Sequence, residues 1–254
     1  MKTITITNRK GGTAKTETAR AIAGGLSLKG YKVLLIDLDA QRNLTLTMGA
    51  STEGRSIYNI LLGECKAAEA IQETPQGDII AASGLLYTID KQIITPFILK
   101  EKLKGLKGYD YIIIDTAPSF NALTVAAMAA ADGLIIPTQA DLYSLSALKQ
   151  IREETEGLKE YNKALKIYGI CITRYANNRI SRDMKASLET IAELIGTKVY
   201  KTVIRECVAI KESAATGKNI FQYAPKSNAA KDYGELVAEI IEDTEGKKGA
   251  KGNV

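Results

Sequence analysis

The chain has 254 residues, 45% of them hydrophobic, with a formal net charge of +5; this length suits one large α/β domain. Histidine is absent, which excludes His-dependent triads and zinc–histidine sites, so any catalysis must use carboxylates, lysines, hydroxyls, backbone amides or a bound metal. No apolar run reaches the roughly 18 residues of a membrane span, and the first residues lack the apolar stretch of a signal peptide, so we expect a cytoplasmic protein.

Short apolar runs rich in β-branched residues alternate with helical stretches along the chain. Continuous apolar strands are typical of parallel sheets covered on both faces, and the segments between them are long enough for right-handed crossovers. We expect strands at 3–7, 33–37, 78–81, 111–115, 134–137, 167–173 and 199–203, and helices at 15–29, 56–63, 95–104, 121–131, 143–163, 181–195 and 227–243. The sequence therefore predicts a single α/β domain (1–244), with a mostly parallel twisted sheet and helices on both faces, and a flexible polar tail (245–254).

A glycine-rich stretch, Asn-Arg-Lys-Gly-Gly-Thr-Ala-Lys-Thr-Glu, directly follows the first predicted strand and spans 8–17. Gly11 and Gly12 allow the backbone to turn its N–H groups toward an anion, and the N-terminus of the next helix adds partial positive charge. Lys15 has the reach for β- and γ-phosphate oxygens, and the Thr16 hydroxyl is a typical Mg²⁺ ligand. By itself this stretch leaves two interpretations open, a nucleotide site or a glycine turn capped by charged residues.

Two more predicted strands end in acidic residues. Asp37 and Asp39 stand two residues apart at the end of the second run, so their side chains face the same side of the strand. Burial of these carboxylates is unfavourable unless they meet a metal, water or a cation. The alternative is a strand that ends in solvent. The run Tyr-Ile-Ile-Ile that ends in Asp115 has the Walker B form, whose aspartate orients Mg²⁺. Ligands of open parallel sheets bind beyond the carboxyl ends of the strands, so we expect these stretches to form one site.

With these motifs in this order and spacing, the chain resembles the ParA/Soj branch of the ParA–MinD ATPases, P-loop NTPases that segregate plasmids and chromosomes. That branch has a deviant Walker A loop with a lysine before Gly-Gly, and Lys-Gly-Gly-Thr-Ala-Lys-Thr at 10–16 matches it. Residues 37–43 resemble the family's D-x-D-P-Q-G-N segment, and 114–119 resemble its Walker B segment and following switch. Stretches 135–139 and 212–223 also run parallel to family segments.

The resemblance implies a weak, Mg²⁺-dependent ATPase whose ATP-bound form is a sandwich homodimer. Lys10 would reach phosphates bound by the other subunit, Lys15 would hold the β/γ oxygens, and Asp39 would position the attacking water. Adenine is expected near Thr173, Arg174 and residues 204–207. The implied nucleotide-binding residues are Lys10, Gly11, Gly12, Thr13, Ala14, Lys15, Thr16, Glu17, Asp115 and Arg174, with Thr16 and Asp115 also serving Mg²⁺.

The chain departs from the family pattern at three places. Ala14 replaces a glycine, and we expect its small methyl group to be tolerated if φ is negative. Ala40 and Arg42 replace Pro and Gly, which is expected to loosen that segment. Glu17 replaces a hydroxyl residue, and a carboxylate about 4 Å from a phosphate charge is repelled by roughly 4 kcal/mol at an effective dielectric near 20. Glu17 must swing away, pair with a neighbouring Lys or Arg, or weaken ATP binding.

Residues 174–218 carry nine Lys and Arg against five Asp and Glu. In the family, the ATP dimer binds DNA without sequence preference through basic residues of the C-terminal half, and such binding falls steeply with salt. The predicted contacts are Arg179, Arg182, Lys211 and Lys218; an ordinary solvated basic surface is the alternative. The resemblance also implies a ParB-like centromere-binding partner that stimulates hydrolysis, and association with the nucleoid.

Three other functions are weighed against this one. A MinD-like membrane-cycling ATPase would need a basic amphipathic C-terminal helix, whereas 235–243 is acidic on its polar face, so no membrane partner is expected. A nitrogenase iron-protein-type reductase would need paired cysteines, whereas Cys65, Cys171 and Cys207 have no paired spacing and are expected to be buried thiols. A degenerate relative with little or no hydrolysis, acting as a scaffold, is kept open by Glu17.

Overall fold

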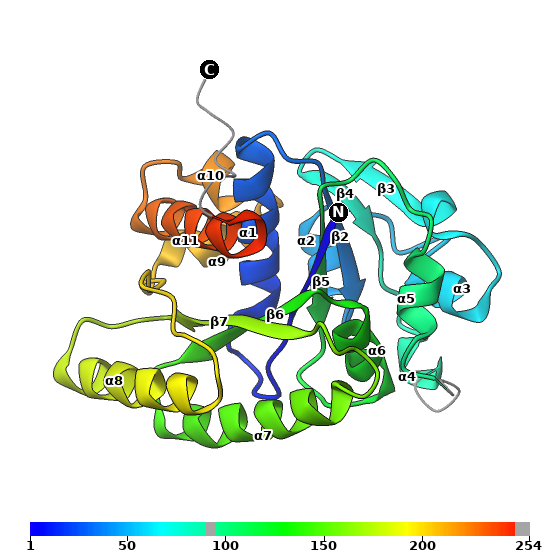
Figure 1. Cartoon of the computed structure of the whole chain (residues 1–254). Coiled ribbons are helices and arrows are strands. Elements are labelled where there is room, and N and C mark those ends of the chain that lie inside the picture. Colours follow the sequence, from blue (N-terminus) through cyan, green and yellow to red (C-terminus); the bar gives the residue numbers. More distant parts are fainter. Residues whose placement is uncertain (90–94, 247–254) are drawn as a thin grey trace.

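The computed structural model describes residues 1–89 and 95–246 and contains a seven-stranded sheet in the order β3-β4-β2-β5-β1-β6-β7 (Figure 1). Every neighbouring pair is parallel except β3 and β4. The strands are β1 (Lys2–Ile6), β2 (Val33–Leu38), β3 (Ile71–Thr74), β4 (Gly77–Ile80), β5 (Tyr111–Thr116), β6 (Gly133–Gln139) and β7 (Lys166–Thr173). All residues of β2 and β5 are buried, as their continuous apolar runs predict for central parallel strands.

Helices cover both faces of the sheet (Figure 1), packed on one apolar cluster on one face and on three clusters on the other. One face carries α1 (Lys15–Leu28), α2 (Asn43–Thr47), α9 (Val208–Ala215), α10 (Ile220–Tyr223) and α11 (Asn228–Glu245). The opposite face carries α3 (Ile57–Leu62), η1 (Ala67–Ala70), α4 (Leu86–Ile89), α5 (Ile98–Leu103), α6 (Ala122–Ala130), α7 (Leu142–Leu158) and α8 (Arg179–Leu194). The predicted α/β fold class is therefore confirmed. Among the described residues, no helix combines the length and apolar character needed to cross a membrane.

The predicted strand at 199–203 is wrong. This segment runs beside β7 through backbone hydrogen bonds, from Tyr200 N–H to the Ile170 carbonyl (2.9 Å) and from Ile204 N–H to the Ile172 carbonyl (2.8 Å), but pairs only through isolated bridges. The Tyr200 ring packs on Gly169, where a Cβ would lie 2.6 Å from Cε2 of the ring. The segment is therefore held against β7 by packing of the Tyr200 ring on the backbone and not by a continuous ladder of strand hydrogen bonds.

Several short elements were not predicted. The antiparallel edge strand β3 joins β4 through Thr74-Pro75-Gln76-Gly77, where Gly77 has φ of +120°; Pro and Gly at these positions are a turn signal. The helices α2, α4, α9 and α10 have eight residues or fewer, too short for a clear periodic pattern. The predicted flexible tail begins at 245, where α11 still continues to Glu245; residues 247–254 lie outside the described residues.

Candidate nucleotide-binding site

The glycine-rich loop lies between β1 and α1, and side chains from three strand ends hold it. The buried Asn8 amide donates to the Pro137 carbonyl (2.7 Å), and its oxygen accepts the Lys10 N–H (2.9 Å). Gln139 donates to the Gly12 carbonyl (2.9 Å), and the Thr173 hydroxyl donates to the Thr13 carbonyl (3.1 Å). The ends of β6 and β7 therefore bind the loop's carbonyl oxygens, and these three anchoring roles were not predicted.

The loop's inner surface fits an anion. A Cβ at Gly11 or Gly12 would meet no heavy atom within 4 Å, and Gly12 has φ of +75°, a conformation that favours glycine. Within the part of the chain that the structure describes, neither glycine N–H donates a hydrogen bond of normal geometry. Free amides at the entrance to a 14-residue helix are suited to phosphate.

Asp115 at the end of β5 is completely buried. Neither of its carboxylate oxygens has a hydrogen-bond partner of normal geometry among the described residues. Burial and the neighbouring Asp37 raise the pKa of Asp115 well above its ordinary value, and the Thr16 hydroxyl and the Lys15 ammonium offset only part of this. An orphaned buried carboxylate beside a threonine hydroxyl fits Mg²⁺, which takes one or two protein oxygens together with phosphates and water.

Lys15 lies in the same pocket, with its side chain largely buried. Its ammonium donates to the Lys10 carbonyl at 3.4 Å. Burial lowers the pKa of Lys15, and the charges of Asp115 and Asp39 oppose this effect. The three predicted stretches are therefore close together, because β2, β5 and β1 are neighbours in the sheet.

The segment after β2 is held by Asp37, which binds backbone and hydroxyl groups. Asp37 accepts the Thr45 N–H (2.8 Å), the Thr45 hydroxyl (2.7 Å) and the Asp39 N–H (3.0 Å). Burial raises the pKa of Asp37 to about 6, although these hydrogen bonds lower it. Asp39 accepts the Gln41 N–H (2.9 Å), which fixes one orientation of its carboxylate, and its charge acts on Lys15 and Asp115 in the pocket. Arg42 adopts φ of +60° here, and the looseness expected from it stays a prediction.

Lys10 forms an ion pair with Asp141, the N-cap residue of α7. Asp141 also accepts the Ser144 N–H (3.0 Å) and the Ser144 hydroxyl (3.0 Å). Burial would raise the pKa of Asp141, but hydrogen bonds from Lys10 and Ser144 outweigh burial and hold this pKa below its ordinary value. In the single chain, Lys10 is therefore held against its own α7.

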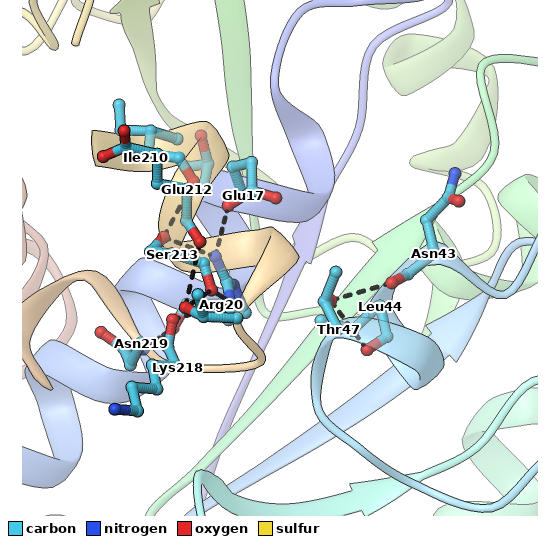
Figure 2. Close-up of polar contacts among 12 residues, drawn as sticks. Glu17, Arg20, Asn43, Leu44, Thr47, Ile210, Glu212, Ser213, Lys218 and Asn219 are labelled. Atoms are coloured by element: carbon cyan, nitrogen blue, oxygen red, sulfur yellow. Dashed lines mark hydrogen bonds and ion pairs between the residues drawn. The ribbon is translucent and has the colours of Figure 1, made fainter. Parts of the chain in front are cut away.

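Glu17 pairs with Arg20 one turn along α1, at 2.8 Å (Figure 2). Of the three outcomes considered for Glu17, the structure contains the ion pair with a neighbouring basic residue. Arg20 also binds Ser213 and Lys218 in the segment around α9.

Ala14 does not meet the condition of a negative φ under which its methyl group would be tolerated without strain. It precedes α1 with φ of +64° and ψ of +33°, in the left-handed region. A Cβ in this region approaches the following carbonyl oxygen, at a cost of roughly 1–2 kcal/mol. The alanine is thus accommodated with strain, which a glycine would avoid.

We expect Ala14→Gly to raise the free energy of unfolding by about 1 kcal/mol, which corresponds to roughly 2–4 °C in Tm for a chain of this size. Thermal unfolding of the nucleotide-free protein measures it. Ala186→Gly, on the exposed surface of α8, is the matched control, and the same substitution there should destabilise by about 0.5–1 kcal/mol. Destabilisation by both changes would contradict strain at Ala14.

The predicted DNA contacts lie on helices of opposite faces. Arg179 and Arg182 are exposed on α8, whose Leu188 packs with α7, whereas Lys211 is exposed on α9 and Lys218 follows it, on the α1 side. Within 174–218, two further basic residues pair with acids of α11: Arg205 with Asp232 and Lys198 with Asp243. The basic excess in the sequence is therefore partly neutralised in the fold.

Of the predicted adenine contacts, Arg174 is exposed with φ of +51° at the end of β7, and Ile204 is buried.

The sheet, the glycine loop with its lysine, and the carboxylate at the end of β5 define a P-loop nucleotide-binding protein. A family model described as "AAA domain" matches residues 1–167, and one described as "4Fe-4S iron sulfur cluster binding proteins, NifH/frxC family" matches residues 87–249. The chain is 34% identical to the chromosome-partitioning ATPase Soj of Thermus thermophilus over 245 residues, 95% of this chain and 96% of that one. The chain therefore belongs to the ParA/Soj family of partition ATPases.

Two solved structures with similar folds contain a nucleotide and magnesium. Cobyrinic acid a,c-diamide synthase of Mycobacterium smegmatis, with a bound ATP analogue and magnesium, superposes with a TM-score of 0.81, 26% identity and 95% coverage of both chains. The septum site-determining protein MinD of Pyrococcus horikoshii, complexed with Mg-ADP, gives a TM-score of 0.78, 25% identity and coverage of 100% of this chain and 99% of that one.

Cys171 is buried as predicted, whereas Cys65 and Cys207 are half-buried, and Cys171 and Cys207 belong to the same apolar cluster. Cys65 packs against the apolar cluster under α3 and α5, and Cys207 against the cluster under α1 and α11, on the opposite face of the sheet. Cys171 is completely buried in β7, and burial raises the pKa of its thiol. These positions do not bring two cysteines to one surface, which is what a cluster bridging two subunits requires.

Proposed function

We propose that this protein is a DNA-partitioning ATPase that binds ATP and Mg²⁺, pairs as an ATP-sandwich homodimer and binds DNA without sequence preference. A ParB-like centromere-binding protein would stimulate its slow hydrolysis, and its place of action would be the cytoplasm, on the nucleoid. The observation that carries the proposal is the pocket where Lys15 and Thr16 lie beside the orphaned Asp115, with Lys10 at its edge. The similarity to Soj over almost the whole chain supports the partition role.

The residues have separate roles in this proposal. The Gly11 and Gly12 amides and Lys15 bind phosphate oxygens, and Thr16, with Asp115 behind it, holds Mg²⁺. Bound Mg²⁺ supplies positive charge that stabilises negative charge developing on the phosphates. Asp39 orients water, and Lys10 leaves Asp141 to reach the nucleotide of the second subunit.

The test is binding to a duplex of arbitrary sequence with ATP, with ADP and without nucleotide, over a salt series. We expect ATP-dependent binding that weakens steeply with salt, and Lys211→Ala/Lys218→Ala should reduce the slope of log K against log[salt] by about 2. A second double variant, Arg179→Ala/Arg182→Ala, tests the predicted contacts on α8 in the same way. Lys198→Ala, whose lysine pairs with Asp243, is the matched control. Binding that is equal with and without ATP would contradict the proposal.

A scaffold with little or no hydrolysis is the second candidate, because Glu17 stands where the family has a hydroxyl residue. Its carboxylate is paired with Arg20, which reduces the repulsion on which that candidate depends. If the wild type bound no ATP while Glu17→Thr did, with Lys15→Ala as the non-binding control, the scaffold function would replace the ATPase.

A further inference from the structure

Arg20 is a buried cation whose two terminal nitrogens donate to four acceptors. Its side chain is 2% exposed and donates to the Glu17 carboxylate (2.8 Å), the Ser213 hydroxyl (2.9 Å) and the carbonyls of Lys218 (3.0 Å) and Ser213 (3.4 Å). Figure 2 shows the guanidinium between Glu17 on α1 and the segment around α9. Of these partners, only Glu17 carries a negative charge that balances the guanidinium.

The same segment is fixed to α1 from a second point. The Asn219 amide donates to the Arg20 carbonyl (2.9 Å) and lies so close to Gly24 that a Cβ there would be 2.1 Å from its Nδ2. Ser213 is fully buried and donates to the Ile210 carbonyl (2.8 Å). The partners of the guanidinium are thus held in place, and Arg20 has little freedom to leave Glu17.

Glu17 lies in the first turn of α1, two residues after Lys15. A charge in that turn adds to the potential at the helix N-terminus, where the phosphate cradle lies. An unpaired carboxylate there would repel a triphosphate and weaken its binding. A carboxylate that is paired with Arg20 and held toward α9 adds much less negative potential.

We propose that Arg20 is a positioning residue for nucleotide binding: it neutralises Glu17 and keeps its carboxylate turned toward α9, away from the phosphate cradle. The inference rests on the nucleotide site of the proposed function but not on dimerisation or DNA binding. It explains how a chain with an acidic residue at this position keeps a site for ATP.

The experiment is a double-mutant cycle on ATP–Mg²⁺ affinity, measured by calorimetry with Arg20→Met, Glu17→Gln and the double variant. Arg20→Met should raise the Kd for ATP about tenfold or more while Glu17 is present, and less than threefold in the Glu17→Gln background. The tenfold change should shrink as salt rises, because the freed carboxylate is partly exposed to solvent. Equal weakening in both backgrounds would mean that Arg20 acts only as a brace for α9, and would overturn the proposal.

Two further measurements distinguish the effect of the Arg20 charge on ATP binding from the effect of Arg20 on the stability of the fold. Arg20→Lys keeps the positive charge but lacks the fork that bridges Ser213 and Lys218, so ATP affinity should fall less than in Arg20→Met; an equal fall would overturn the proposal. Thermal unfolding without nucleotide should show destabilisation by Arg20→Met in both Glu17 backgrounds, whereas the effect on ATP affinity depends on Glu17. If the wild type and Arg20→Met bound ATP with the same affinity, this inference alone would be wrong. If the wild type did not bind ATP, the proposed function would be wrong as well.

Discussion

Lys10→Ala is expected to abolish ATP-dependent dimerisation and to lower the hydrolysis rate by about 10³-fold, whereas each separate subunit should still bind ATP. The groups of the loop that bind phosphate are Lys15 and the amides of Gly11 and Gly12. Their positions do not depend on the Lys10 side chain. That side chain lies at the pocket edge, 28% exposed and paired with Asp141. A cation supplied from a second subunit stabilises transition-state charge by about 10³–10⁵ in rate in phosphoryl transfer. Sedimentation with and without ATP, together with single-turnover hydrolysis, measures both effects.

Asp141→Asn is the reciprocal variant. Asparagine caps helices as well as aspartate does, so α7 should keep its N-terminus while the ion pair with Lys10 is lost. Lys10 would then leave its own subunit more easily, and dimers should form at lower ATP concentration than in the wild type. A Lys10→Ala protein that dimerised normally with ATP would contradict the role across subunits.

The sheet and the phosphate loop were predictable because their signals are local. Buried parallel strands read as continuous apolar runs, and a loop lysine with adjacent glycines lies next to its strand. Asp37 and Asp115 could be placed together because neighbouring parallel strands end at one edge, and they are directly paired in the register of β2 and β5. The edge strand β3 and the short helices lack such long patterns.

The support of the site was less predictable, since it depends on contacts between distant residues. The hydroxyl of Thr173 holds the carbonyl of Thr13, 160 residues away, and nothing in the local sequence of either residue signals that bond. The φ of Ala14 is set by the turn into α1, not by the alanine's own preference. Glu17 and Arg20 are close in sequence, but the burial that fixes Arg20 comes from Ser213 and Lys218.

Asp39→Ala should lower ATP hydrolysis by about 10²–10⁴-fold, the usual contribution of a general base or water-orienting residue, while ATP binding and dimerisation persist. Asp39 is half-buried, its carboxylate is oriented by the Gln41 N–H, and its charge acts on both Lys15 and Asp115. The chain has no histidine to take over proton transfer. The variant should therefore accumulate as an ATP-bound dimer that stays on DNA.

Asp37→Asn is the control, because Asp37 lies two residues earlier on the same segment but is occupied by Thr45 and the Asp39 N–H. A neutral amide of the same size removes a negative charge beside Asp115 and weakens the contacts with Thr45, but it leaves the Asp39 carboxylate in place. Hydrolysis and DNA residence time, measured side by side, separate the two aspartates. Were Asp39→Ala to hydrolyse ATP at the wild-type rate, another group would have to orient the water, and the assignment of Asp39 would be wrong.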